Sequence, residues 1–336
     1  MKKNKNQHNI PELLKRFLLD HLHSHQNASL NTIGAYRDTF RLLLEYLQKH
    51  CHVRPEKVAI KDLSTKNILG FLDYLQKERK NSIRTRNMRL AVIRSFVNYL
   101  LLIDPTLNGE LYGVLSIPVK KTSKTILDYL TREEMNSILE APDEHTFIGQ
   151  RDRVLLLVMY NTGARVSEIS QIKVSDIKFN ARSANIHLFG KGRKQRSLPL
   201  WKNTTKVLRQ WIDKNKYTSE MSVFQSKRGT TLTRFVISNR LSVNVAKASK
   251  KNPSLKKKTV SPHTIRHTTA MHFLQSGIDI ATIAMWLGHE SIETTQIYIA
   301  ADMEMKEKAL KSLHEPETKR FRYKPSDSLL TFLENL

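Results

Sequence analysis

Cysteine is almost absent from this sequence, and long hydrophobic runs are absent altogether. Cys51 is the one cysteine among 336 residues, which excludes an intramolecular disulfide and a cysteine-based zinc site. No apolar stretch reaches the roughly 20 residues that a bilayer-spanning helix needs, and no secretion-signal segment follows the lysine- and asparagine-rich start. We therefore expect a protein of the reducing cytoplasm that has no membrane segment.

Acidic residues are also scarce relative to basic ones. The chain has 31 Asp and Glu against 56 Lys and Arg, a formal net charge of +25. So large an excess repels itself in a compact fold, and a polyanion such as nucleic acid is the partner that best relieves it. A highly soluble surface and a membrane-surface role are the alternatives. The basic residues are spread along the whole chain and form no single basic amphipathic helix, which favours nucleic acid.

The first hundred residues have the hydrophobic periodicity of helices. Four helices are predicted here. Ser29 to Asn31 offer caps for the second helix, and Ser64 and Ser82 open the third and fourth. One face of the fourth helix is basic, which suits contacts to a DNA backbone, although a plain helical bundle with a solvated charged face fits equally well. Its arginines are Arg84, Arg86, Arg89 and Arg94.

The second half mixes helices with a few strands. Thr131 to Glu134 forms a capping box, and Val154 to Met159 reads as a core helix. The turn Gly190-Lys191-Gly192 joins two strands as a hairpin. We therefore predict a mainly α fold with a small antiparallel β-sheet. The predicted parts are a helical domain over 8–105, a linker over 106–128, an α/β mixed domain over 129–315 and a tail over 316–336. The tail ends in a short apolar segment, which either docks on a partner subunit or folds back.

Five short segments of the second half contain residues suited to chemistry at a phosphodiester. Attack on phosphorus places negative charge on the non-bridging oxygens, and arginine meets this charge with paired donors, without a metal. Arg165 follows a glycine turn, and Glu168 lies one turn further and can hold its guanidinium. His263 and Arg266 are three residues apart and share a helix face. His289 follows a glycine at a turn between helices.

Lys191 and Tyr298 supply the two remaining functions. Lys191 lies at the hairpin tip between two glycines, where it could protonate a departing sugar oxygen. Tyr298 could attack phosphorus and form a phosphotyrosine ester, which keeps the bond energy, so that rejoining needs no ATP and no metal. Taken alone, each residue has an ordinary reading, as a charged turn residue or a packed aromatic. Zinc binding is a weaker alternative for four histidines, since no carboxylate or cysteine completes a tetrahedral set. They are His263, His267, His272 and His289.

These motifs, in this order and at these spacings, resemble the tyrosine recombinases, also known as lambda-type or Xer-type integrases, over residues 8 to 315. The resemblance implies that Arg165, Arg266 and His289 bind the scissile phosphate. It implies that His263 accepts a proton, Lys191 is the general acid, Tyr298 forms a 3′-phosphotyrosyl intermediate, and Glu168 supports the site. The family fold is a helical, SAM-like core-binding domain plus a mixed catalytic domain that close around double-stranded DNA.

The resemblance also implies partners. A dimer is expected on each DNA site and a tetramer in synapsis, passing through a Holliday junction, either as a homo-oligomer or with a related recombinase, and with the tail exchanged between protomers. No cofactor is implied. Integration or excision of a mobile element is the expected role, and no extra arm-binding domain is expected before residue 8. Two alternatives stay open: a type IB topoisomerase, and a DNA-binding accessory protein without catalysis. Further DNA contacts are predicted for Arg84, Arg86, Arg89, Arg193, Lys194, Arg196 and His267.

Overall fold

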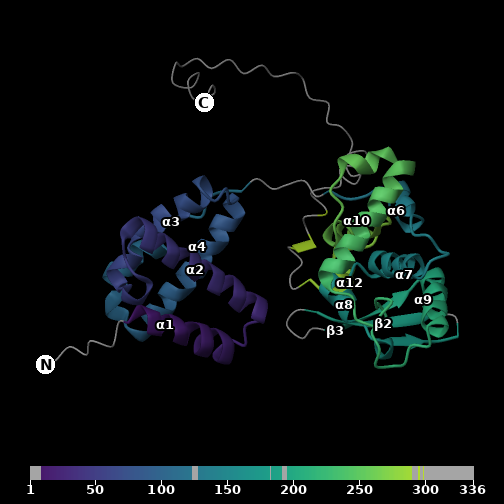
Figure 1. Cartoon of the computed structure of the whole chain (residues 1–336), viewed down its shortest axis with the longest axis horizontal. Coiled ribbons are helices and arrows are strands. Elements are labelled where there is room, and N and C mark those ends of the chain that lie inside the picture. The colour runs from purple at the N-terminus through teal and green to yellow at the C-terminus, as the bar shows by residue number, and fades with distance from the viewer. Residues whose placement is uncertain are drawn as a thin grey trace, which may run out of the picture. The chain divides into compact units, whose positions relative to one another are not determined.

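The computed structural model describes residues 9–122, 128–181, 183–190 and 195–289, together with Thr294, Thr295 and Tyr298. The chain divides between Lys124 and Thr125 into two compact units, and each is described here by itself (Figure 1). The described part is mostly helical and contains one three-stranded antiparallel sheet, the predicted fold class. Within it, no helix combines the length and the apolar character needed to cross a membrane.

The first unit consists of helices alone. Its elements are α1 (Ile10–Arg16), the π-helical η1 (Phe17–His25), α2 (Leu30–Cys51), the 3₁₀ turns η2 (Pro55–Lys57) and η3 (Ile60–Leu63), α3 (Thr65–Lys77), α4 (Ile83–Ile103), η4 (Pro105–Leu107) and α5 (Asn108–Leu115). Serine caps set where three of these helices begin. The side chains of Ser29, Ser64 and Ser82 each accept a backbone N–H from the third residue of the helix that follows. The predicted starts of α2, α3 and α4 are therefore confirmed.

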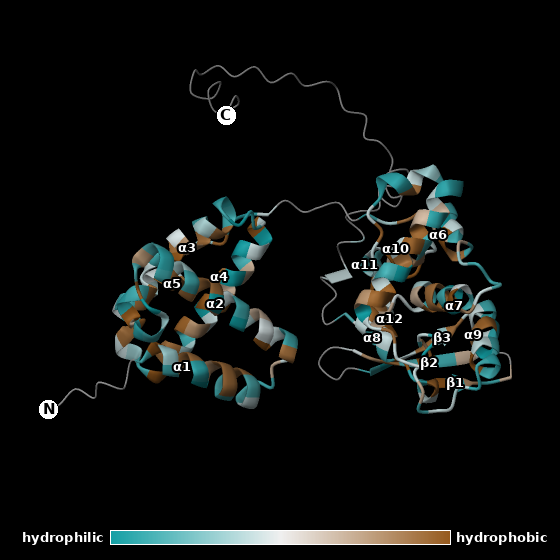
Figure 2. Ribbon diagram, viewed as in Figure 1, coloured by the Kyte–Doolittle hydropathy of each residue, from teal (hydrophilic) through white to brown (hydrophobic). Residues whose placement is uncertain are grey.

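A group of aromatic rings lies within the mainly aliphatic core of this unit. Figure 2 shows how apolar and polar residues alternate along its helices. The ring of Phe17 lies with its centroid 5.2 Å from that of Phe96 and 5.2 Å from that of Tyr99. Phe17 is fully buried and Phe96 is 1% exposed, so these contacts are shielded from water. The core also contains Phe71, Leu72 and Leu90, which are fully buried.

The structure extends this helical unit beyond the predicted end at Pro105. Asp104 caps a short turn that Pro105 begins, and α5 follows directly. Proline is accepted at the first position of a helical turn, so Pro105 starts an element here and does not end the fold. Leu111 and Val114 of α5 are fully buried in the core. Helix α5 therefore belongs to the first unit, where the sequence predicted a linker segment.

Replacing Leu72 by alanine should destabilise the first unit by about 2–5 kcal/mol, because Leu72 is fully buried and the truncation leaves a cavity. All three tryptophans, Trp201, Trp211 and Trp286, belong to the second unit. The urea transition followed by far-ultraviolet circular dichroism should therefore shift while the tryptophan-fluorescence transition does not. Leu102→Ala is the matched control, because Leu102 is 74% exposed. Equal shifts for the two variants would contradict the assigned core.

The second unit combines helices with a small sheet that buries one of its faces. Its elements are α6 (Arg132–Leu139), α7 (Phe147–Thr162), α8 (Val166–Gln171), η5 (Val174–Asp176), β1 (Ile177–Phe179), β2 (Ala184–Phe189), β3 (Gln195–Leu200), α9 (Lys202–Lys214), α10 (Arg234–Lys251), η7 (Pro253–Lys257), α11 (Pro262–Gln275) and α12 (Ile280–Leu287). The strands pair antiparallel in the order β1-β2-β3. Ile186 pairs with Leu198, and both side chains are buried. The predicted hairpin of β2 and β3 is therefore confirmed.

Helix α7 runs through the core of this unit and contacts α9, α11 and β3. Its apolar residues from Val154 to Met159 are buried, as predicted. One polar residue of α7 also lies inside. Asp152 is fully buried and accepts hydrogen bonds from Arg151, from Arg240 at 2.7 Å and from Asn244 at 3.0 Å. This network ties α7 to α10 and gives the buried carboxylate the hydrogen-bond partners that burial requires.

Candidate functional site

The site begins where α7 ends. Gly163 adopts a left-handed conformation with φ +58°, and a Cβ added there would lie 2.6 Å from the Leu287 side chain. Glycine is required on both counts, because it accepts the positive φ and lets α12 approach the backbone closely. Arg165 follows as the N-cap of α8, and its backbone N–H donates to Glu168 Oε2 at 2.9 Å. The turn thus places an arginine at the junction of α7, α8 and α12.

Glu168 is the centre of a buried ion-pair network. Its carboxylate accepts from Arg165 Nη1 at 3.0 Å and from Arg196 Nη2 at 2.7 Å, and its side chain is 2% exposed. Burial alone would raise the pKa of Glu168, but the hydrogen bonds and charge of Arg196, with the bonds from Arg165, hold it below its ordinary value. The carboxylate therefore stays ionised and fixes both guanidinium groups, which confirms the predicted pairing of Arg165 with Glu168.

Three arginines converge on the last carbonyls of α12. Arg196 Nε donates to Trp286 O at 2.8 Å, Arg266 Nη2 to Leu287 O at 2.8 Å, and Arg165 Nη2 to Gly288 O at 3.2 Å. The C-terminal carbonyls of a helix lack intrahelical partners and carry partial negative charge, so they attract cations. Gly288 ends the helix with φ +67°, and His289 comes next. The end of α12 therefore gathers the arginines beside His289.

Helix α11 contributes Arg266 and two histidines. Ser261 caps this helix and Pro262 occupies its first turn. Arg266 is 4% exposed and also donates to Gly163 O at 2.8 Å. Burial, followed by the charge of Arg165, lowers the pKa of Arg266 to about 10, so the guanidinium remains charged at neutral pH. Burial, then Arg266 and Arg165, also lowers the pKa of His263, which lies within the field of these cations.

Tyr298 lies inside this cluster. It is 1% exposed, and its hydroxyl is 3.0 Å from His267 Nδ1. Its ring is nearly parallel to that of His289, at 14° with centroids 6.4 Å apart, and His289 Nδ1 is 2.7 Å from Thr295 Oγ1. Burial raises the pKa of Tyr298 to about 12, against a smaller lowering by Arg266. The phenol is therefore neutral at physiological pH and needs a proton acceptor before it can attack.

The structure brings together most of the residues that were predicted for the site. Arg165, Glu168, Arg266, His289 and Tyr298 lie in one connected group of hydrogen bonds, ring contacts and charges, and His263 lies in the same field of cations. Three predicted residues on the hairpin turn lie outside the described residues. They are Lys191, Arg193 and Lys194.

Two of the predicted DNA contacts, Arg196 and Arg86, have protein partners in this structure. Arg196 uses Nε, Nη1 and Nη2 for Trp286 O and Glu168, and its side chain is 11% exposed, so it supports the cluster from within. Arg86 is 3% exposed and donates to Pro118 O at 3.1 Å, so it anchors the segment after α5. In both cases a residue distant in sequence accepts hydrogen bonds from the guanidinium. Of the other two α4 residues, Arg84 is exposed, and Arg89 is half-buried and donates to Thr39 Oγ1.

His267 has a role that the sequence reading missed. It was predicted as a DNA contact, but the structure gives it the hydroxyl of Tyr298 as a partner. Its spacing from His263 was an available signal, because residues four apart on a helix lie on one face. His272 faces elsewhere. Its two ring nitrogens lie 2.7 Å from Tyr160 Oη and 2.9 Å from Leu130 O, which is the environment of a structural histidine and not of a zinc ligand.

Acidification should destabilise the second unit through its buried histidines. Burial, with His263 and Arg266, lowers the pKa of His267 to about 4, and burial, with Arg266 and Arg165, lowers that of His289 to about 4. Between pH 6.5 and 4 the unfolded chain binds protons that the folded unit does not, so stability present above pH 6.5 is lost as the pH falls through this window. Thermal unfolding followed by tryptophan fluorescence should show this loss, with a shallower slope for His267→Gln. An identical slope for that variant would refute the assignment.

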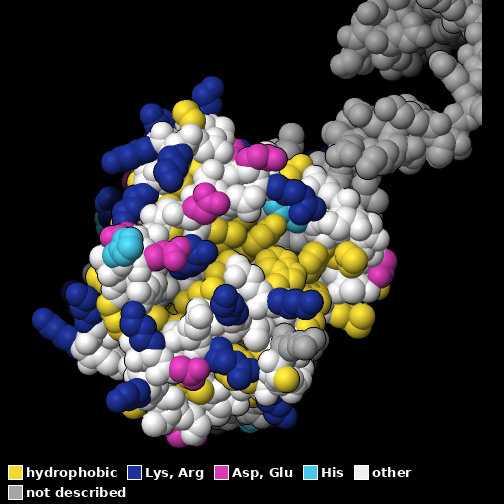
Figure 3. All heavy atoms as spheres, turned by 90° about the vertical axis from the view of Figure 1, so that its right-hand side faces the viewer, with side chains coloured by type: hydrophobic (Ala, Val, Ile, Leu, Met, Phe, Trp, Pro, Cys, Tyr) yellow, Lys and Arg dark blue, Asp and Glu magenta, His cyan; other side chains and the backbone are white. Residues whose placement is uncertain are grey.

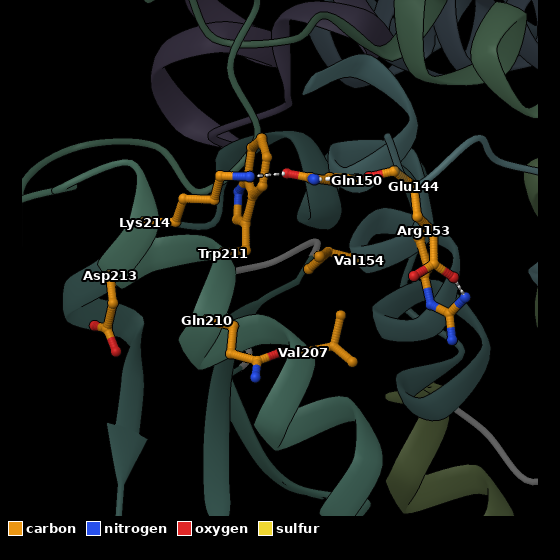
Figure 4. Close-up of a pocket in the computed structure, with 9 residues that line it drawn as sticks. All are labelled: Glu144, Gln150, Arg153, Val154, Val207, Gln210, Trp211, Asp213 and Lys214. Carbon is orange, nitrogen blue, oxygen red and sulfur yellow. Dashed lines mark hydrogen bonds and ion pairs between the residues drawn. The ribbon is translucent and has the colours of Figure 1, made fainter. Parts of the chain in front are cut away.

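A cavity of about 540 Å³ lies elsewhere on the second unit, between α7 and α9. Figure 4 shows Val154, Val207 and Trp211 on its walls, with Lys214 bound to Gln150 at its rim. No residue of the cluster lines this cavity. Figure 3 shows the face of this unit that lies on the right in Figure 1, where Lys and Arg side chains are spread around a hydrophobic hollow. The candidate site is therefore the cation and histidine cluster, and the cavity is separate from it.

Comparison with known proteins covers both units. The model of the phage integrase family matches residues 128–305, and that of the phage integrase N-terminal SAM-like domain matches residues 14–102. The putative integrase/recombinase y4rC of Sinorhizobium fredii is 40% identical over 327 residues, covering 97% of this chain and 98% of the relative. Tyrosine recombinase XerC of Chlamydia trachomatis is 32% identical over 314 residues, covering 88% and 96%.

Solved structures share the fold. The XerH site-specific recombinase bound to palindromic difH substrate, in a post-cleavage complex, has a TM-score of 0.67 with 20% sequence identity. The alignment covers 92% of this chain and 89% of that one. At this identity the structural similarity shows the fold alone. Family membership rests on the two family models and the two relatives in sequence.

Proposed function

Because the chain belongs to the phage integrase family of tyrosine recombinases, enzymes that cleave and rejoin DNA, we propose that it does so through Tyr298. The observation that supports this most is the enclosure of the Tyr298 phenol within one cluster with Arg165, Arg266 and His289. A phosphate that enters this cluster would meet two fixed guanidinium groups and an imidazole, a preorganised setting for the negative charge of phosphoryl transfer.

The proposed reaction exchanges one P–O bond for another. The Tyr298 oxygen attacks phosphorus, the bond to the 5′-oxygen of the next nucleotide breaks, and a 3′-phosphotyrosyl ester forms. The phenol proton passes to His263 in this scheme, and Lys191 protonates the departing 5′-oxygen. Rejoining is the reverse, with the 5′-hydroxyl as the nucleophile. Cleavage and rejoining each exchange one phosphate ester for another, so the bond energy is conserved and the scheme needs neither ATP nor a metal.

The contact of Tyr298 with His267 bears on the first proton transfer. His267 Nδ1 lies 3.0 Å from the phenol, and its lowered pKa keeps the ring neutral at pH 7, so it can accept a hydrogen bond. A general base must lie within hydrogen-bond reach of the proton that it removes. His267 meets that condition, which supports a proton path that runs from Tyr298 through the histidines of α11.

The first unit is proposed to clamp the DNA backbone together with the second. The net charge of +25 and the exposed Arg84 support backbone contacts through the helices of this unit. We further propose a dimer on each DNA site and a tetramer in synapsis, with the tail over 316–336 exchanged between protomers; the tail lies outside the described residues. Integration or excision of a mobile element is the proposed role, supported by the 40% identity to a putative integrase/recombinase.

A nicked suicide duplex tests the proposal. Sites are first selected from random duplex DNA by binding to the protein, and a nick close to the cleavage point then lets the short 5′-hydroxyl fragment diffuse away. A covalent adduct should survive denaturing electrophoresis, and mass spectrometry of its peptides should locate the nucleotide on Tyr298. Adducts on another residue would overturn the assignment, and no adduct on any tightly bound site would favour the accessory-protein alternative. Relaxation of a supercoiled plasmid without two-site exchange would indicate the topoisomerase alternative.

A further inference from the structure

We propose that Arg196 is a positioning residue for DNA cleavage. It fixes Arg165 and the end of α12 to one buried carboxylate, so that the cations that receive the scissile phosphate keep their spacing. The inference rests on the proposed function and adds a residue that acts through its neighbours without touching DNA. Its basis is the geometry of Arg196 in β3, Glu168 in α8 and the turn after α12.

Each nitrogen of the Arg196 guanidinium donates to a protein acceptor. Nη2 donates to Glu168 Oε2 at 2.7 Å, Nη1 to Glu168 Oε1 at 3.2 Å and Nε to Trp286 O at 2.8 Å. The side chain is 11% exposed. A planar fork that binds both oxygens of a carboxylate fixes direction as well as distance, which a lysine cannot do. Arg196 therefore sets the orientation of Glu168 and, through it, of Arg165.

The same guanidinium lies against the turn that presents His289. A Cβ added to Gly288 would lie 3.0 Å from Arg196 Nη1 and 3.3 Å from its Cζ, and Gly288 has φ +67°. The carbonyl of Gly288 also accepts the hydrogen bond from Arg165 Nη2. Gly288 thus accepts from Arg165 and leaves the space beside its Cα to the Arg196 guanidinium, so the position of Arg196 limits where this turn can lie.

Arg196 differs from the other two arginines in which of its nitrogens bind the α12 carbonyls and which bind Glu168. Arg165 and Arg266 reach the α12 carbonyls with Nη2, a terminal nitrogen, and Arg165 keeps a side chain that is 30% exposed. Arg196 reaches its carbonyl with Nε and uses both terminal nitrogens for Glu168. Arg165 thus keeps an exposed side chain, and Arg196 is the arginine whose Nε and two terminal nitrogens all bind protein acceptors and hold Glu168 in place.

A comparable ion pair in the same unit provides a matched control. Arg240 Nε donates to Asp152 at 2.7 Å, the Asp152 side chain is fully buried and the Arg240 side chain is 22% exposed. This pair ties α10 to α7 and contacts none of the cluster residues named above. Arg240→Lys therefore removes a similar buried pairing without moving Arg165 or the end of α12.

The experiment compares Arg196→Lys with Arg240→Lys in the full chain. We expect Arg196→Lys to bind the selected duplex as the unaltered protein does, yet to form the suicide adduct on the order of 10²-fold more slowly in single turnover, the effect of small misplacement at a reacting centre. Arg240→Lys should keep the unaltered rate at a comparable loss of melting temperature. Equal rates for the two variants, or a loss of DNA affinity that matches the loss of rate, would overturn the proposal.

Two altered substrates identify the step on which Arg196 acts. A methylphosphonate at the cleavage point removes the phosphate charge, so the defect of Arg196→Lys should shrink if that variant misplaces the cations. A 5′-sulfur leaving group departs without an acid, so it should leave the defect unchanged. A defect that persists on the neutral substrate, or that disappears with the sulfur substrate, refutes the assignment. No adduct from the unaltered protein would refute the proposed function itself, which is a different result.

Gly288→Ala provides a second approach if Arg196→Lys proves too unstable to assay. The added methyl group would lie 3.0 Å from Arg196 Nη1 and press on its guanidinium, and the left-handed φ adds strain at the same turn. We expect the same separation of a slow cleavage rate from intact DNA affinity. A Gly288→Ala protein that cleaves at the unaltered rate would contradict the proposal.

Discussion

Tyr298→Phe should leave DNA binding intact and abolish the covalent adduct. The substitution removes the oxygen that we propose forms the phosphotyrosyl ester, and it keeps the aromatic ring, which is 1% exposed and packs with the α11 and α12 residues. Loss of a nucleophile removes the whole covalent pathway, so no residual adduct is expected above background. The measurement pairs the suicide-substrate assay with equilibrium binding to the same duplex.

Tyr160→Phe is the matched control for this experiment. Tyr160 belongs to the same unit, and its hydroxyl also meets a histidine, since it lies 2.7 Å from His272 Nδ1. The control variant should lose about 1 kcal/mol of stability, as expected for one buried hydrogen bond, and keep its adduct. If Tyr298→Phe lost DNA affinity as well, Tyr298 would be a structural residue. If it retained the adduct, another nucleophile would have to be sought.

Arg266→Gln should reduce the rate of adduct formation by about 10²–10³-fold or more, the usual effect of removing one donor from a preorganised anion site. Arg266 contributes a fixed charge and ties Gly163 O to Leu287 O through its two terminal nitrogens. Arg266→Lys should recover little, because a single ammonium cannot span both carbonyls and a phosphate. Single-turnover rates and melting temperatures of the variants give the measurement.

Arg209→Lys is the control for charge and length. Arg209 lies on α9, donates to Asn180 O at 2.7 Å and rests over the Phe179 ring, away from the cluster. It should cleave at the unaltered rate. Cleavage by Arg266→Gln at a rate within a few-fold of the control would show that this guanidinium does not serve the transition state.

Local signals in the sequence were enough to place the elements that carry the site. A helix cap depends on a side chain three residues from its partner, which is why Ser82 and the box from Thr131 to Glu134 predicted where α4 and α6 begin. Helix α12 ends at Leu287, and Gly288 and His289 follow in a turn, as the glycine before His289 predicted. The pairing of Arg165 with Glu168 was equally local, because one helical turn separates them.

The parts that sequence reasoning missed depend on partners far along the chain. Arg196 meets Glu168, 28 residues away, and Trp286, 90 residues away, and Arg86 meets Pro118 across 32 residues. A basic residue looks the same in a sequence whether its charge faces DNA or a buried carboxylate, so the sequence alone predicts DNA contacts for both of these arginines. Only the packing of β3 and α4 against their neighbours distinguishes the two cases.

The enclosure of Tyr298 has a consequence for the protein before it meets its target. A phenol that is kept uncharged, hidden from solvent and hydrogen-bonded to an imidazole is a dormant nucleophile. Such a phenol would not react with phosphodiesters that are not bound in the cluster, because their phosphorus is not held in line among the guanidinium groups. If Tyr298 is the nucleophile, as proposed, we expect the protein to bind nonspecific DNA without nicking it, because cleavage would need a phosphate seated among the guanidinium groups.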